Sequence, residues 1–284
     1  MVTKSKRGTS KKKSKRKPNL KVIILAVALL MLSALAWLFL TESGRHFGRN
    51  TIPYFKRIEQ QFFSSPYVPI ADAYCIDVSR FQGDINWAEL STIPYNVATR
   101  RQGKKEKTAS SDIIIVFVKA TEGADFVDTK SQANQQGVRS TNIKYGAYHV
   151  MTMAPVADQF QNFITNSGLV KGDIRPVIDL EESILANHKP TIVRQNLKEL
   201  VALLKKHYGV RPIIYASHNF GSLIIDSELA HCPLWVARYG VATPPEHADI
   251  WQFAENGSIP GVFWPVDLDA IYFNRFKIND LLIK

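Results

Sequence analysis

The chain has 284 residues, of which 45% are hydrophobic, and a formal net charge of +11. That length and apolar content suffice for one sizeable domain with appended segments. Residues 1–21 hold ten Lys and Arg and no acid, so residues 22–284 carry only one of the eleven net positive charges. This distribution excludes a generally basic binding surface on the folded domain.

Residues 22–40, which follow this basic tail, predict a transmembrane anchor. They number 19, none is charged, and a helix of that length spans roughly 30 Å, the hydrocarbon thickness of a bilayer. A basic flank stays in the cytoplasm, so the tail is expected to face the membrane and not nucleic acid. A cleaved signal peptide ending near Ala34-Leu35-Ala36 is the alternative, but the apolar run continues to Leu40 and favours an uncleaved anchor. Both interpretations place the remaining chain in the periplasm or outside the cell.

Residues 41–72 contain three prolines and are expected to form a juxtamembrane stalk, which leaves 73–284 as the folded domain. Within that domain, residues 98–111 are polar and basic and indicate an exposed surface loop. The two cysteines, Cys75 and Cys232, could pair in an exported chain. Two buried, unpaired small side chains are the favoured interpretation.

Short apolar runs alternate with helical patterns along the domain. Several runs are apolar throughout, which is typical of strands buried on both faces of a parallel sheet. The predicted strands are 74–79, 113–120, 144–150, 175–180, 211–217, 234–239, 249–253 and 265–270. The predicted helices are 131–140, 156–167, 191–207 and 219–225. Residues 240–248 are too short and Pro-rich for a crossover helix. The pattern predicts an α/β fold, a TIM-like barrel with an irregular closing part.

Four acids are predicted to meet at one end of this barrel. Asp77 ends the first strand, Asp179 and Glu181 end the fourth, and Asp267 lies on the last. Catalytic groups in such barrels lie at the C-terminal strand ends. Because strand side chains alternate, Asp179 and Glu181 share a face and Glu182 points away.

This grouping suits glycoside hydrolysis, which needs a protonated carboxyl and a nearby negative charge. Asp77 and Asp267, each taken alone, also have a plainer interpretation, since a single Asp at a strand end is commonly a helix cap or turn former. Lys119 and Glu122 are read as a structural ion pair near the mouth, and His149 as a hydrogen-bonded core residue. Aromatic residues near strand ends could offer faces for sugar rings, although the tryptophans are more often core: Tyr148, Tyr215, Trp235, Tyr239 and Trp251. No metal-ligand spacing, phosphate loop or serine elbow is found, so no cofactor and no metal is expected.

Eight motifs in order resemble those of glycoside hydrolase family 25, the Chalaropsis-type lysozymes. They are CIDVSRFQGDINW (75–87), FVKATEG (117–123), YGAYHV (145–150), PVIDLEE (176–182), IIYAS (213–217), LWVARY (234–239), IWQF (250–253) and PVDLD (265–269). The resemblance covers about residues 73–284. It implies an irregular (β/α)5(β)3 barrel and an N-acetylmuramidase acting on the glycan strands of peptidoglycan.

The resemblance also implies a role for each acid. Glu181 is similar to the family's general acid, and Asp179 to the group that stabilises positive charge, directly or through the substrate's N-acetyl group. Asp77 and Asp267 resemble residues that tune and position at the mouth. Residues that resemble pocket-lining groups are Tyr148, Tyr215, Trp235 and Gln252.

Two departures from the family stand out. Asp269 occupies a position where the family commonly has Asn, and the basic 98–111 loop is long. Three other functions stay open on the sequence: a non-catalytic peptidoglycan clamp, an envelope scaffold, and a glycosidase with another substrate. Loss of either acid of the Asp179–Glu181 pair would favour the clamp, and both are present.

Overall fold

The computed structural model describes residues 68–92, 100–101, 104–105 and 113–284. The chain divides into two compact units, Met1–Lys56 and Arg57–Lys284, and every residue that the structure describes belongs to the second. The basic tail, the transmembrane anchor and nearly all of the stalk lie outside the described residues, as does most of the 98–111 loop. In the part that is described, no helix is long and apolar enough to cross a membrane.

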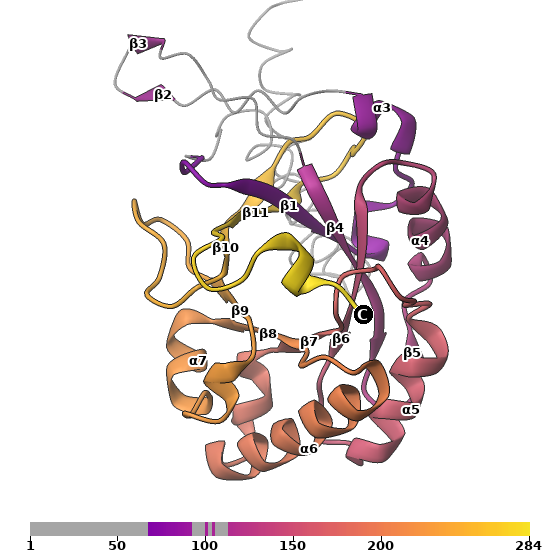
Figure 1. The fold of residues 1–284 in the computed structure, drawn as a ribbon, viewed down its shortest axis with the longest axis vertical. Helices are drawn as coiled ribbons and strands as arrows, with labels where there is room; N and C mark the ends of the chain where they lie inside the picture. Colours follow the sequence, from indigo (N-terminus) through magenta and orange to yellow (C-terminus); the bar gives the residue numbers. More distant parts are fainter. Residues whose placement is uncertain (1–67, 93–99, 102–103, 106–112) are drawn as a thin grey trace, which may run out of the picture. The chain divides into compact units, whose positions relative to one another are not determined.

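Eight of the described strands form a closed barrel, in the ring order β1, β4, β6, β7, β8, β9, β10 and β11. Neighbours from β1 to β10 run parallel, and β11 closes the ring antiparallel to both β10 and β1 (Figure 1). The bounds are β1 Ala73–Val78, β4 Ile113–Glu122, β6 Lys144–Val150, β7 Val177–Leu180, β8 Ile213–Ser217, β9 Leu234–Ala237, β10 Ile250–Gly257 and β11 Val266–Ile271. The prediction of a mixed α/β barrel is confirmed.

Helices follow the first five barrel strands and no α-helix follows the last three among the described residues. They are α3 Trp87–Thr92, α4 Ser131–Arg139, α5 Val156–Asn166, α6 Pro190–Tyr208 and α7 His218–Ile224. This is the (β/α)5(β)3 arrangement that the family resemblance implies. Short elements complete the fold: η1 Arg80–Gln82, β5 Phe126–Val127, η2 Glu182–Ala186, η3 Leu229–His231 and η4 Ile278–Leu281, with a separate two-stranded ribbon of β2 Arg100–Arg101 and β3 Lys104–Lys105.

The predicted elements agree with the observed ones to within a few residues. The longest helix, α6, has Pro190 at its start and ends at Gly209, whose φ of +74° is a left-handed conformation that suits glycine. The largest difference is β10, which continues to Gly257 and is interrupted twice in its pairing with β11. Such interruptions are β-bulges, which local sequence patterns do not reveal.

The apolar core has two parts, one on each side of the barrel wall. The interior cluster includes Phe117, Trp235 and Leu281, and the outer cluster packs the wall against the helices. Cys75 belongs to the interior cluster and Cys232 to the outer one, and both thiols are buried and unpaired. The interpretation of the cysteines as buried small side chains is therefore confirmed.

Candidate active site

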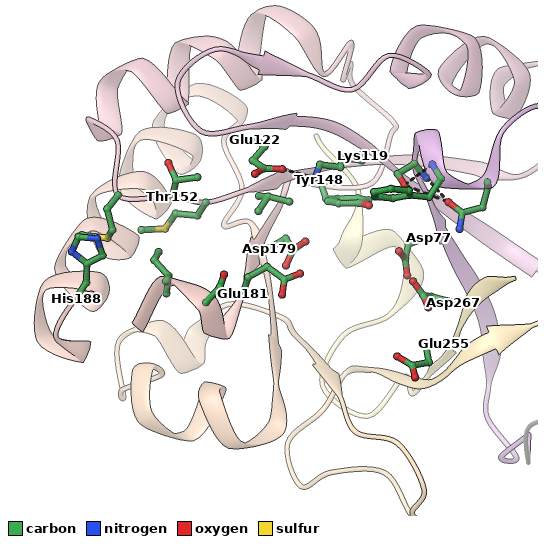
Figure 2. Close-up of a pocket in the computed structure, with 18 of the residues that line it drawn as sticks. Asp77, Lys119, Glu122, Tyr148, Thr152, Asp179, Glu181, His188, Glu255 and Asp267 are labelled. Atoms are coloured by element: carbon green, nitrogen blue, oxygen red, sulfur yellow. Dashed lines mark hydrogen bonds and ion pairs between the residues drawn. The ribbon is translucent and has the colours of Figure 1, made fainter. Parts of the chain in front are cut away.

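The carboxyl ends of the parallel strands surround a cavity of about 730 Å³ (Figure 2). Its lining includes Asp77, Asp179, Glu181 and Asp267, the four acids selected from the sequence. An adjoining cavity of about 120 Å³ shares these acids and is otherwise lined by Tyr148, Tyr215, Trp235 and Gln252. The structure thus brings all eight residues singled out in the sequence to one place.

Asp77 lies at the end of β1, opposite Asp267 in the β1–β11 ladder. Its carboxylate accepts a hydrogen bond of 2.8 Å from Gln252 Nε2. The amide oxygen of Gln252 accepts in turn from the hydroxyls of Tyr215, at 2.8 Å, and Tyr239. Two phenols therefore fix the amide so that its NH₂ group faces Asp77.

Burial raises the pKa of Asp77 well above its ordinary value, and the negative charges of Asp267 and Asp269 raise it further. The hydrogen bond from Gln252 acts in the opposite direction because it stabilises the carboxylate. Gln252 therefore favours the charged form of Asp77, which burial and the neighbouring acids disfavour.

Asp179 and Glu181 stand at the end of β7 on the same face, since both line the two cavities. Asp179 is only 8% exposed, and its Oδ1 has no hydrogen-bond partner within the described structure. Glu181 is exposed in an extended conformation just before η2. Glu182 lines neither cavity and accepts a hydrogen bond of 2.5 Å from Ser217 Oγ, so the prediction that it points away is confirmed.

Burial raises the pKa of Asp179 well above its ordinary value, and the charge of Glu181 raises it further. Lys119 lowers the same pKa but is held by Glu122, with 2.7 Å between Nζ and Oε2. The expected ion pair at the mouth is therefore present. A proton on Glu181 would therefore remove one of the charges that raise the pKa of Asp179.

The aromatic residues divide into cavity lining and core. Tyr148 and Tyr215 line the small cavity, and Trp235 lines it although it is only 2% exposed. The Trp235 indole donates to Asp269 Oδ1 at 2.8 Å and packs against Tyr215. Trp251 is a core residue whose indole donates to the carbonyl of Arg238, so it offers no face to a sugar.

His149 is a hydrogen-bonded core residue, as the sequence analysis favoured. It bonds to Thr121 Oγ1 at 2.8 Å and to Gln159 Oε1 at 3.2 Å. Burial lowers its pKa to about 4, so the ring is neutral near pH 7. In the described ranges, no group of three or more His, Cys, Asp or Glu side chains is placed to hold a metal ion.

Several cavity residues escaped the sequence analysis. The most notable is Glu255, an exposed acid on β10 that joins the others at the mouth. Another group, from the loop after β6 and from the region around η2, forms part of the wall: Met151, Thr152, Met153, Ser183, Ile184, Asn187 and His188. These positions lie beyond the strand ends, where no catalytic pattern marks them.

Comparison with known proteins gives the family. The model of glycosyl hydrolases family 25 matches residues 76–262, about two thirds of the chain. The chain belongs to this family. It is therefore an enzyme, a glycoside hydrolase, and the resemblance seen in its motifs is confirmed.

Two curated relatives illustrate the range of similarity. The YegX protein of Escherichia coli K12 is 29% identical over 199 residues, which cover 69% of this chain and 68% of that protein. The autolytic lysozyme of Clostridium acetobutylicum is 26% identical over 161 residues, 56% of this chain and 49% of that enzyme.

Solved structures of the family are similar to this one. A family 25 glycosyl hydrolase from Bacillus anthracis matches with a TM-score of 0.62 and 25% identity, over 74% of this chain and 94% of that chain. The lysozyme of Streptomyces coelicolor matches with a TM-score of 0.60 and 25% identity, over 74% and 95%. The likeness therefore extends over nearly the whole of each comparison enzyme.

Proposed function

We propose that the protein is a lysozyme that hydrolyses the β-1,4 bond between N-acetylmuramic acid and N-acetylglucosamine in peptidoglycan. The observation that carries the proposal is the convergence of Asp77, Asp179, Glu181 and Asp267 on one cavity in a member of this family. Relatives named autolytic lysozyme and Lysozyme M1 support the substrate. The reaction needs a proton donor for the leaving oxygen and an anion for the positive charge that develops on the sugar.

Glu181 is the proposed proton donor. It is the exposed member of the pair, so a glycosidic oxygen bound in the cavity can reach its carboxyl group. Asp179 is the buried member, and its charge would stabilise the positive sugar directly or through the N-acetyl group. Burial raises the pKa of Asp179 and opposes this charge, so the charged form depends on Lys119, which lowers that pKa, and on removal of the Glu181 charge when Glu181 carries the proton.

Asp77 and Asp267 are proposed to tune and position rather than to exchange protons with the substrate. Asp77 is held by Gln252, and Asp267 stands opposite it on the neighbouring strand. Both residues line the cavity where the oxocarbenium-like transition state would develop. Tyr148, Tyr215 and Trp235 would form the wall against which the sugar lies.

The experiment compares the full-length chain with Glu181→Gln on purified peptidoglycan, with released sugars reduced and identified by mass spectrometry. The wild type should release fragments with N-acetylmuramic acid at the reducing end. Loss of the proton donor should lower the rate roughly 10²–10⁴-fold. Glu182→Gln is the matched control, because the neighbouring residue makes the same change outside the cavity and should retain activity.

Other outcomes would point to other functions. Tight binding of peptidoglycan with no cleavage by the wild type would contradict the proposal and favour a non-catalytic clamp. Cleavage that survives Glu181→Gln would contradict its assigned role. A requirement for the protein in the envelope that survives this substitution would favour a scaffold.

We further propose that residues 22–40 anchor the enzyme in the membrane as a single pass, with the basic tail in the cytoplasm and the hydrolase domain in the periplasm or outside the cell. The support is the uncharged 19-residue run after ten basic residues. The full-length chain should stay in the membrane pellet after a carbonate wash and keep its N-terminus. A mature N-terminus just beyond Ala36 would instead establish a cleaved signal peptide.

A further inference from the structure

Glu255 reaches the cavity because of an irregularity in β10. In the β10–β11 ladder, Gln252 pairs with Asp269 and Ala254 pairs with Leu268, so β10 advances two residues where β11 advances one. In a regular strand, residues three apart point to opposite faces. The extra residue reverses this alternation and brings Glu255 to the face occupied by Gln252.

Figure 2 shows Glu255 below Asp267, across the cavity from Glu122. Its side chain is exposed, so its charge carries little desolvation cost. In the part of the chain that the structure describes, the side chain of Glu255 has no hydrogen-bond or ion-pair partner. The other carboxyl groups that line the cavity are those of Asp77, Glu122, Asp179, Glu181 and Asp267, and Lys119 of the same lining is already paired with Glu122.

The hydrolysis itself does not call for this fifth acid. The proposed reaction uses Glu181 and Asp179, with Asp77 and Asp267 beside them. The same cavity holds the buried Oδ1 of Asp179, which has no partner among the described residues. A buried acceptor without a donor is completed by a ligand or by water, so donors of the bound substrate are expected here.

We propose that Glu255 binds an ammonium group of the substrate, and that the enzyme therefore prefers peptidoglycan carrying free amines. The inference rests on the proposed lysozyme function and names a preference within it. An N-acetylated sugar offers only neutral hydroxyl and amide donors, whereas an ammonium group offers three charged N–H donors. Two sources share this chemistry: a glucosamine that lacks its N-acetyl group, and the side-chain amine of a diamino acid in the stem peptide.

The test measures kcat/KM of the full-length chain on two substrate pairs. The first pair is peptide-free glycan, fully N-acetylated or partly N-deacetylated at glucosamine. The second is peptide-bearing peptidoglycan with free side-chain amines, before and after these are blocked by acetic anhydride. The wild type should prefer the amine-bearing member of at least one pair by roughly threefold, the size expected for an exposed ion pair.

Glu255→Gln should remove that preference while leaving cleavage of the fully N-acetylated glycan within about twofold. Glu199→Gln is the matched control, because Glu199 is an exposed acid on α6 that lines neither cavity of the site, and it should keep the preference. The preference should also shrink at high salt, since exposed charges are screened. Which pair responds identifies the source of the amine.

Equal rates on both members of both pairs would overturn the inference while leaving the lysozyme function intact. A preference that persists in Glu255→Gln would also overturn it, since the amine would then be recognised elsewhere. Failure of the wild type to cleave any of the four substrates would remove the proposed function, and the inference with it.

Discussion

Asp269 is the residue where this chain departs from the common family pattern, and its surroundings explain how a carboxyl is accommodated there. It is 0% exposed and lies opposite Cys75 in the β1–β11 ladder and Gln252 in the β10–β11 ladder. One oxygen accepts from the Trp235 indole, and the Cys75 thiol also bonds to the carboxyl group. Burial raises the pKa of Asp269 well above its ordinary value, the charge of Asp267 raises it further, and the bond from Trp235 lowers it.

Asp269→Asn is expected to stabilise the protein at neutral pH. Folding raises the pKa of Asp269, so the protonated carboxyl stabilises the folded state relative to the charged one. This contribution to stability is fully present below about pH 4, the pKa of Asp in the unfolded chain. It is lost as the pH rises through the pKa in the folded chain. Asn keeps an acceptor for Trp235 and does not titrate. The free energy of unfolding of Asp269→Asn, measured in urea, should exceed that of the wild type at pH 7.5. The difference between the two proteins should be smaller at pH 4.5. An equal difference at both values would contradict this account.

At the scale of elements, the contact between α3 and α4 depends on a glycine. A Cβ built on Gly137 of α4 would lie 2.0 Å from Nε1 of the Trp87 indole at the start of α3. No real Cβ tolerates that distance, so the ring or the helix must move. The absence of a side chain at Gly137 is what lets the two helices approach.

Gly137→Ala should therefore lower the free energy of unfolding by about 1–3 kcal/mol, the cost of overpacking, even though Ala favours a helix. Gly221→Ala is the matched control in α7, where the nearest atom is the Ala216 Cβ at an ordinary 3.6 Å. It should be neutral or stabilise by up to about 1 kcal/mol. Urea unfolding of both variants tests the difference, and equal effects would show that Trp87 moves aside freely.

On the scale of the whole molecule, the chain's last residues close the barrel at the end away from the active site. The backbone of residues 172–175, just before β7, bonds to Leu281 and Ile283: Arg175 N donates to Leu281 O at 2.8 Å, and Ile283 N donates to Asp173 O at 2.9 Å. Leu281 is buried in the interior cluster with Ile174. Stability and catalysis are thus located at opposite ends of the same barrel, as is general for this architecture.

Leu281→Ala should lower the free energy of unfolding by about 2–5 kcal/mol, the range for removing a buried leucine. Its kcat/KM, measured well below the melting temperature, should stay near that of the wild type. Leu223→Ala in α7 is the control, because Leu223 is 53% exposed and its loss should change stability by no more than about 0.5 kcal/mol. A large loss of activity in the folded Leu281→Ala variant would contradict the separation of the two ends.

Much of the fold and of the site was predictable because it depends on local patterns. Apolar runs locate the barrel strands, and the 3.6-residue periodicity locates α4 to α7. The position of an acid at the end of a predicted strand was enough to place Asp77 and Asp179 at a common mouth. Asp267 reaches the same mouth from near the start of β11, because that strand runs antiparallel to its neighbours. The basic tail and the uncharged 22–40 segment predict a membrane anchor. Both segments lie outside the described residues, so this stays a prediction.

By itself, the sequence determined the element order, the family and the strand-end positions of Asp77, Asp179 and Glu181, since each follows from residue types and their spacing along the chain. Only the tertiary structure decided that Glu255 faces the cavity, that Asp269 bonds to Trp235, and that Gln252 links two tyrosines to Asp77. The physical reason is that these contacts depend on the register between strands. A bulge of one residue reverses which face a side chain occupies, and the partner strand that imposes it is distant in sequence.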